Sequence, residues 1–343
     1  MRLLFLLALL GPVTAYPGMG ALMSDLKEEL TKRQPPGGVP GSTELIGDLA
    51  TLPNSALTPV GVQLKGILQL TILPTDVTST YTKPGALGSA ACTASKCCVW
   101  SYIRDAMAAA FVTSGQCNAL ARGAVRLGFH DSGTWQRGQA TGGADGSVVL
   151  SGSEITRADN NGLQTIAARM QTWYNTYHQY GVGMADLIQF GAKVAVRVCP
   201  GGPRIRTFVG RVDSSTANPS GLLPNVNSSP ATLISLFANK TIVAGGLVAL
   251  VGAHTTSRQQ FFDTAHALTP QDTTPGLWDN LFYSQTTAAT PPSGILKFPS
   301  DVALSVNSQT SGVWSLFSTP AGAAIWNRVS FFFSFSFSFF FPL

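Results

Sequence analysis

The segment from Arg122 to Leu150, RGAVRLGFHDSGTWQRGQATGGADGSVVL, contains residue types that proton-transfer chemistry needs. If residues 118–130 form a helix, Arg126 and His130 are four positions apart and share one face. A permanent cation then lies beside a base that is close to neutral at physiological pH. Such a pair can move a proton while the cation stabilises negative charge nearby.

The same segment supplies oxygen atoms of the kind that bind calcium. Asp131 follows His130 directly and points to a different side of the predicted helix. The glycine-rich loop behind it ends in Gly143, Asp145 and Ser147, and the carbonyl of Gly143 is a further oxygen. Hard cations such as Ca²⁺ take oxygen ligands. We call Asp131, the Gly143 carbonyl, Asp145 and Ser147 the first calcium set.

A second histidine has a similar neighbourhood. His254 lies near the end of the apolar run 243–258, VAGGLVALVGAHTTSR. Five nearby residues carry suitable oxygens and form the second calcium set: Thr255, Asp272, Thr274, Leu277 through its carbonyl, and Asp279. Asp and Thr next to turns also cap helices, and this alternative stays open for both sets.

These patterns occur in a fixed order. R-x-x-F-H-D is followed by G-G-A-D-G-S, and G-A-H-T is followed by D-T-T-P-G-x-x-D. Together they resemble the secreted fungal haem peroxidases of generic, low-potential type, in class II of the plant-type peroxidase superfamily. The resemblance covers roughly residues 92–327. It implies an all-α fold of two lobes with one haem b between them, the distal lobe at about 92–221 and the proximal lobe at about 222–328.

The resemblance implies roles for residues on the distal side of the haem. His130 would take a proton from hydrogen peroxide and return it to the leaving oxygen, while Arg126 stabilises the developing negative charge. Asn160 matches the amide that orients this histidine in the family. Phe129 would pack over the haem, although a plain core position is an equal and compatible reading.

The proximal side is expected to contain the iron ligand. His254 would bind the haem iron as a neutral imidazole, and Asp301 would accept a hydrogen bond from its other nitrogen. Asp301 also suits the first turn of a helix, which is the simpler alternative. His178 and His266 lack a motif and are interpreted as structural.

Departures from the family motifs reduce the range of electron donors that we expect. Ala119, Gly123 and Gln260 replace the acids of manganese-oxidising relatives, so we expect no manganese site. Ala249 replaces the surface tryptophan of relatives that attack lignin. Small phenols or dyes are therefore the expected donors. Gln271 stands where relatives place an aromatic residue near the proximal histidine, which leaves redox tuning open.

The chain has an odd number of cysteines. The resemblance implies the disulfides Cys92–Cys98 and Cys117–Cys199, with Cys97 paired to a cysteine near the C-terminus. None follows Cys199 here. The Phe/Ser-rich tail at 329–343 suggests why: our hypothesis is that a retained intron in the gene model replaces the family-like ending. A genuine tail is the alternative.

Composition limits the other function classes. The 343 residues are 45% apolar and 11% charged, with a net charge of +5 and no dense basic run, so nucleic acid is not an expected partner. Residues 1–15 read as a secretory signal, 16–33 as a possible propeptide, and 34–91 as an extended Pro/Gly/Ser-rich extension. The sequons at Asn227 and Asn239 suit an exported surface. We expect a secreted monomer without a membrane span.

Apolar periodicity predicts helices throughout the remainder. The predicted spans are 98–113, 118–130, 162–180, 184–198, 230–238, 243–257, 278–286, 300–308 and 313–327. Two other functions stay open. A serine protease conflicts with the order of the residues and with the helical pattern. A haem-binding extracellular protein with impaired catalysis is the runner-up.

Overall fold

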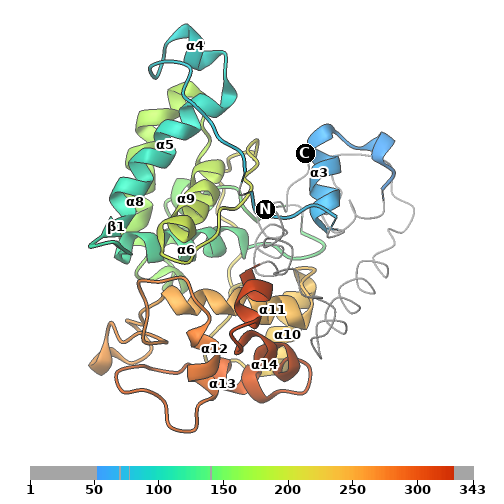
Figure 1. Cartoon of the computed structure of the whole chain (residues 1–343), viewed down its shortest axis with the longest axis vertical. Helices are drawn as coiled ribbons and strands as arrows, with labels where there is room; N and C mark the ends of the chain where they lie inside the picture. Colours follow the sequence, from blue (N-terminus) through green and yellow to red (C-terminus); the bar gives the residue numbers. More distant parts are fainter. Residues whose placement is uncertain (1–51, 69–70, 77, 140, 328–343) are drawn as a thin grey trace, which may run out of the picture.

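A computed structural model of the chain describes residues 52–68, 71–76, 78–139 and 141–327. The predicted signal segment, the propeptide and the Phe/Ser-rich tail therefore lie outside the described residues. Figure 1 shows two helical lobes, one coloured cyan to yellow-green and the other orange to red. Within the described residues, β-structure is limited to the hairpin of β1 (Val112–Thr113) and β2 (Gln116–Cys117) and two isolated bridges. The all-α prediction is confirmed.

Helices of the distal lobe pack around α6 (Ala119–Ser132) and α9 (Met184–Val198). The lobe contains α4 (Ala90–Thr93), α5 (Lys96–Phe111), α7 (Ser147–Leu150), η2 (Glu154–Thr156), η3 (Ala158–Asn160), α8 (Gln164–Tyr177) and η4 (His178–Tyr180). Asn118 caps α6 by accepting hydrogen bonds from the N–H groups of Leu120 and Ala121 at 3.0 and 3.2 Å. This cap explains why the predicted start of the helix was correct.

The helices of the proximal lobe are mostly shorter than the sequence predicted. They are α10 (Pro230–Asn239), α11 (Ala244–Val251), η5 (Gly252–Thr256), η6 (Thr264–His266), α12 (Leu281–Thr287), α13 (Pro299–Val306) and α14 (Ser311–Phe317). The predicted helix 313–327 is wrong as one element, because α14 ends at Phe317 and a separate helical turn covers 322–327. Pro320 explains this break, since proline has no N–H to donate and disfavours helix at Thr319.

The segment predicted as an extended arm contains a helix. Helix α3 (Pro59–Leu68) follows η1 (Asn54–Ala56) and buries Leu64 and Ile67. It lies beside the two lobes in Figure 1, coloured blue. The prediction is corrected for residues 59–68, where short apolar patches form one buried helical face.

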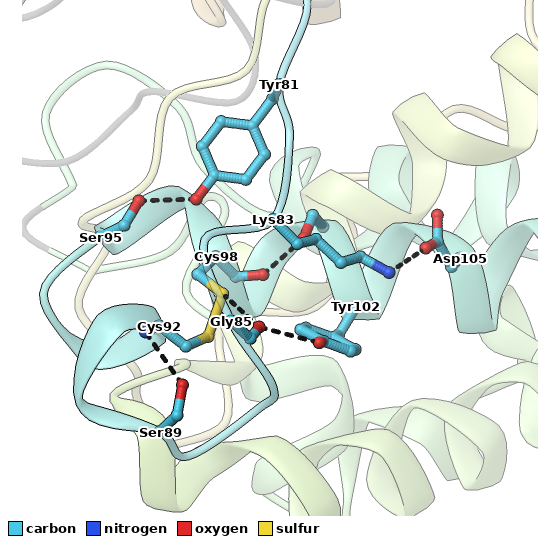
Figure 2. The surroundings of a disulfide bond; sticks show 10 residues. Tyr81, Lys83, Gly85, Ser89, Cys92, Ser95, Cys98, Tyr102 and Asp105 are labelled. Carbon is cyan, nitrogen blue, oxygen red and sulfur yellow. Dashed lines mark hydrogen bonds and ion pairs between the residues drawn. A yellow bond between two sulfur atoms is a disulfide. The ribbon is translucent and has the colours of Figure 1, made fainter.

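A disulfide holds the chain entering α5 (Figure 2). Cys92 and Cys98 are bonded, and Cys92 N–H donates to Ser89 Oγ at 3.3 Å. Tyr102 donates to the Gly85 carbonyl at 3.0 Å, and Lys83 pairs with Asp105. A second disulfide joins Cys117 to Cys199, so both pairs implied by the resemblance occur. Cys97 is exposed and free among the described residues.

Several hydrogen bonds between described residues connect the lobes. Cys117 N–H donates to the Gly276 carbonyl at 3.1 Å, and Trp278 N–H donates to the Pro200 carbonyl at 2.8 Å. Lys240 Nζ, which is fully buried, donates to the carbonyls of Gly133 and Trp135 at 2.8 and 2.9 Å. Both ends of α6 are thereby held against the other lobe, which positions the side chains between them.

Among the described residues, no single helix has the length and apolar composition to cross a bilayer. The pair Pro230–Asn239 and Ala244–Thr256 has them only when the two helices are taken together, and the pair is bent by 102°.

Candidate active site

A chain of hydrogen bonds fixes the orientation of His130. Arg126 Nε donates to His130 Nε2 at 3.1 Å. His130 Nδ1 lies 2.8 Å from Asn160 Oδ1, and Asn160 Nδ2 donates to the Glu154 carbonyl at 2.8 Å. Because Nε2 accepts and Oδ1 can only accept, the proton of the neutral ring belongs on Nδ1. The free lone pair of His130 therefore lies on the side of Arg126.

The electrostatic surroundings keep His130 neutral. Burial, and after it the charge of Arg126, lowers the pKa of His130 from 6.5 to about 3, against the opposing hydrogen bond of Asn160. Arg126 Nη1 and Nη2 donate to the carbonyls of Asn161 and Asp159 at 2.7 and 2.9 Å. The guanidinium is thus held in place by backbone oxygens beside an unprotonated base.

His254 forms a second histidine–acceptor pair. Its Nδ1 lies 2.9 Å from Asp301 Oδ2, while the Asp301 carboxylate is 1% exposed and the His254 side chain is 31% exposed. The rings of Phe282 and Phe298 meet the imidazole edge-on at centroid distances of 5.5 and 5.6 Å. Nε2 has no hydrogen-bond partner among the described residues. An imidazole held at Nδ1, with Nε2 available, fits a haem-iron ligand.

Gln271 is buried on the same side. It is 1% exposed, and the Ser257 hydroxyl, which is 2.7 Å from the His254 carbonyl, bonds to Gln271 Oε1. Gln271 Nε2 has no hydrogen-bond partner in the described part of the chain. A polar amide therefore occupies a core position near His254.

Phe129 contacts both His130 and the other lobe. Its ring centroid is 5.8 Å from that of His130 and 6.3 Å from that of Phe237, on which it stacks. Phe237 belongs to α10, so Phe129 also serves as a core aromatic at the junction between the lobes.

The structure brings three side chains of the first calcium set into one buried region. Asp131, Asp145 and Ser147 are at most 1% exposed. Asp131 Oδ2 accepts from Gly146 N–H at 3.2 Å, but Oδ1 has no partner among the described residues. Burial, followed by the charge of Asp145, raises the pKa of Asp131 well above 3.8. A buried carboxylate oxygen without a partner fits a bound cation.

Glu154 and Asn218 lie beside this set, and the sequence had not indicated a role there for either side chain. Glu154 Oε1 accepts from Asn218 N–H at 2.8 Å. A hollow next to them is lined by Thr134, Arg157, Asp159, Asn160 and residues 219–223. Among the described residues, no three or more His, Cys, Asp or Glu side chains are grouped to hold a metal. In either calcium set, hydroxyl and carbonyl oxygens would supply the remaining ligands of an ion.

The second calcium set is built around Asp272. Thr255 Oγ1 donates to Asp272 Oδ2 at 2.5 Å and lies 3.3 Å from Asp279 Oδ1. Thr274 N–H donates to Asp272 Oδ1 at 2.8 Å and its carbonyl accepts from Leu277 N–H at 2.9 Å. Burial raises the pKa of Asp272 to about 6. The side chains of this set are together, and the hydrogen bonds are also compatible with a capping role.

The donor-related positions lie in different environments. Ala119 and Gln260 are exposed and Gly123 is half-buried. Ala249 is fully buried in α11, and its carbonyl accepts from Trp326 Nε1 at 2.9 Å. Position 249 is therefore in the core of this chain, beside Trp326.

The sequons lie on the surface, with Asn227 and Asn239 both exposed. Of the two histidines interpreted as structural, His178 stacks on Tyr174 at 5.3 Å, and His266 pairs with Asp263 at 2.7 Å. In the described part of the chain, the contacts of both residues lie outside the two histidine networks.

Known proteins are similar to this chain over the part that contains the two histidine networks. The family model "Peroxidase" matches residues 103–319, a span that includes both histidine networks. "Peroxidase" from Coprinopsis cinerea is 32% identical over 217 residues, covering 59% of this chain and 59% of the relative. "Peroxidase" from Arthromyces ramosus is 32% identical over 200 residues, covering 56% and 54%. "Ligninase H2" from Phanerodontia chrysosporium is 30% identical over 248 residues, covering 64% and 65%. The matches thus span less than two thirds of the length of each of these relatives.

Proposed function

Because the chain belongs to the peroxidase family, and within it to the fungal class II haem peroxidases, we propose that it reduces hydrogen peroxide. The electrons come from small phenolic or dye-like donors, one at a time. The observation that carries this proposal is the geometry of His130, whose Nδ1 is occupied by Asn160 while Nε2 accepts from Arg126.

Cleavage of hydrogen peroxide requires a base and a fixed cation. Hydrogen peroxide must lose a proton from one oxygen and gain a proton on the other before its O–O bond breaks unevenly. His130 takes the first proton at Nε2 and returns it to the leaving oxygen, because its low pKa keeps the ring unprotonated. Arg126 stabilises negative charge on that oxygen. Asn160 holds the ring in the productive tautomer.

Haem b, when bound, supplies the iron that exchanges electrons with peroxide and donor. His254 would hold this iron through Nε2. Asp301 would accept a hydrogen bond from Nδ1–H, which would make His254 a more basic ligand and favour the oxidised metal. Phe129 would pack against the haem.

Calcium is proposed for both sets. The unpartnered Oδ1 of Asp131 supports an ion in the first set. Since His130 and Asp131 are adjacent in α6, this ion would hold the end of the helix that carries the base. Thr255 is adjacent to His254 in the same way, so the second ion would hold the proximal ligand.

Donor class and location follow from residue identities. Ala119, Gly123 and Gln260 provide no carboxylate for manganese, and Ala249 provides no tryptophan for electron transfer from bulky donors. We therefore propose small aromatic donors that react at the haem edge. The signal-like residues 1–15 and the two disulfides support export.

Replacing His130 with Leu tests the function. The holoprotein of this variant is expected to lose peroxide-dependent oxidation of a phenolic dye by about 10²–10⁴-fold, because the base is gone. Haem binding, followed by the Soret absorption band, should persist because His254 is unchanged. His178→Leu is the matched control and should retain full activity, since His178 lies exposed in a separate stacking contact.

Two results would contradict the proposal in different ways. Near-normal dye oxidation by His130→Leu would remove His130 from its role as the base. An unmodified protein that binds haem but does not oxidise the dye would instead favour the second candidate, a haem-binding extracellular protein with impaired catalysis. The polar, partly unsatisfied Gln271 beside the proximal network is the observation that motivates this candidate.

A further inference from the structure

Asn218 places its side-chain amide within the first calcium set. The residue is 2% exposed. Its Nδ2 lies 2.8 Å from Ser147 Oγ and 3.1 and 3.2 Å from the two carboxylate oxygens of Asp145. Thr134 Oγ1 is a fourth oxygen, at 3.0 Å. The amide nitrogen is thus surrounded by oxygens in a position that resembles that of a cation.

The backbone of Asn218 is held on both sides. Its N–H donates to Glu154 Oε1 at 2.8 Å, and its carbonyl accepts from Arg157 Nη2 at 2.6 Å. These two contacts fix the Cα position, so the remaining freedom is the rotation of the planar amide. Either end of that amide can therefore be presented to the same oxygens.

Four acceptors exceed what the amide nitrogen can serve, because it carries two hydrogens. Thr134 Oγ1 donates its own proton to the Asp131 carbonyl at 2.7 Å. The Ser147 hydroxyl accepts from the amide of Asn218, which leaves its single proton for one neighbouring acceptor. Both hydroxyl oxygens consequently turn lone pairs toward Asn218. The site is richer in acceptor oxygens than an amide donor requires.

A carboxyl oxygen without a partner among the described residues lies in the same set. Asp131 Oδ1 is fully buried and has no partner among the described residues. A divalent cation between Asp131 and Asp145 would satisfy it, but this cation would repel the positive end of the amide, Nδ2. A 180° turn about the Cβ–Cγ bond exchanges Nδ2 for Oδ1 without a change in shape. The oxygen then faces the ion.

We propose that Asn218 is a ligand of the calcium ion in the first calcium set and binds it through Oδ1. The proposal rests on the calcium part of the proposed function. It adds a neutral oxygen ligand, from a loop about seventy residues further along the chain than Asp145 and Ser147. Calcium would then connect that loop directly to α6 and α7.

The test compares the holoproteins of the unmodified chain, Asn218→Ala and Asn218→Asp. Calcium affinity and stoichiometry are measured by isothermal titration calorimetry after chelation. Asn218→Ala is expected to bind calcium about 10- to 100-fold more weakly at one site, with the other site unchanged. Asn218→Asp keeps an oxygen and adds charge, so it should bind at least as tightly as the unmodified chain. Asn225→Ala, an exposed asparagine nearby, is the control.

Terbium(III) luminescence gives a second measurement, which would stay unchanged if Asn218 had only a structural role. Terbium replaces calcium, and the difference in its decay rate between H₂O and D₂O counts coordinated waters. Asn218→Ala should gain about one coordinated water where the ligand oxygen was lost. If Asn218 only donates hydrogen bonds to Asp145, the water count stays constant and Asn218→Asp binds calcium more weakly.

Each outcome bears on the inference separately from the peroxidase assignment. Unchanged calcium binding and an unchanged water count in Asn218→Ala would overturn the ligand role. If Asn218→Ala does not fold, weaker binding by Asn218→Asp overturns it instead. An unmodified protein that reacts with peroxide but binds no ion in this set refutes the calcium ligand and leaves the peroxidase function intact.

Discussion

At the scale of single residues, the charge of Arg126 lowers the pKa of His130. In the proposed mechanism the same charge would also stabilise the leaving oxygen of the peroxide. We expect the second-order rate constant for peroxide to fall with decreasing pH only near the pKa of about 3. In Arg126→Leu the charge is lost, so the pKa of His130 rises and this acid limb moves to higher pH. The overall rate also falls, by about 10²–10³-fold.

A pH series on the two holoproteins measures this effect. Arg169→Leu is the control, because Arg169 is exposed and lies over the ring of Trp173 instead. An acid limb that stays in place or moves to lower pH in Arg126→Leu would contradict the coupling between the two residues.

We expect Asp301 to act on the haem iron through His254. Asn in its place keeps an oxygen near Nδ1 but removes the negative charge, so His254 becomes a weaker electron donor. We expect the ferric/ferrous midpoint potential of Asp301→Asn to rise relative to the unmodified holoprotein. Spectroelectrochemical titration measures the potential, and Asp263→Asn is the control because Asp263 pairs with the exposed His266. A potential that is unchanged or lower would exclude this role for Asp301.

The sequence predicted some residue-scale contacts and missed others. Arg126 and His130 share a helix, so their spacing was sufficient to bring them together. Asn218 and Asp145 are 73 positions apart and meet only through the tertiary fold. Ala249 and Trp326 are likewise 77 positions apart and meet only through the tertiary fold.

At the scale of elements, glycine and proline determine where the proximal helices stop. The predicted helix 243–257 divides into α11 and the 3₁₀ turn η5 at Gly252. A Cβ on Gly252 would lie 2.3 Å from the Tyr283 hydroxyl oxygen and 2.4 Å from Trp326 Nε1, so only glycine fits. Apolar periodicity predicted the helical stretch, but it carries no information about this tertiary contact. His254 consequently lies in the 3₁₀ turn.

Lys240 connects the segment after α10 to the end of α6. Burial lowers its pKa from 10.5 to about 8. Between these values the unfolded chain binds more protons than the folded one, so the free energy of unfolding should rise with pH. The rise attributable to Lys240 is at most about 3 kcal/mol. Lys240→Met abolishes this rise in the free energy of unfolding. The substitution also leaves the carbonyls of Gly133 and Trp135 without this donor.

Urea unfolding of both proteins at several pH values between 8 and 10.5 measures the effect. The exposed Lys96→Met is the control and should follow the unmodified protein. An equal pH dependence in Lys240→Met and the unmodified chain would show that Lys240 is not buried as a charged donor.

At the scale of the whole molecule, the two-lobed helical arrangement was predictable because the family motifs and the apolar periodicity agree. The helix α3 was not, because a Pro- and Gly-rich stretch surrounds it and its buried face is short. The interlobe contacts of Cys117, Trp278 and Lys240 were also beyond prediction, since each pairs a side chain or backbone group with a distant carbonyl. These contacts hold the two lobes against each other, and with them the two histidine networks.

An absorption spectrum of the ferric holoprotein, taken before and after one equivalent of hydrogen peroxide, tests the peroxidase assignment most directly. With His254 as the sole protein ligand of the iron and His130 unprotonated, we predict a five-coordinate ferric Soret band that shifts rapidly with peroxide. The original band should return when a phenol is added. A protein that binds no haem, or a Soret band that peroxide leaves unchanged, would contradict the assignment.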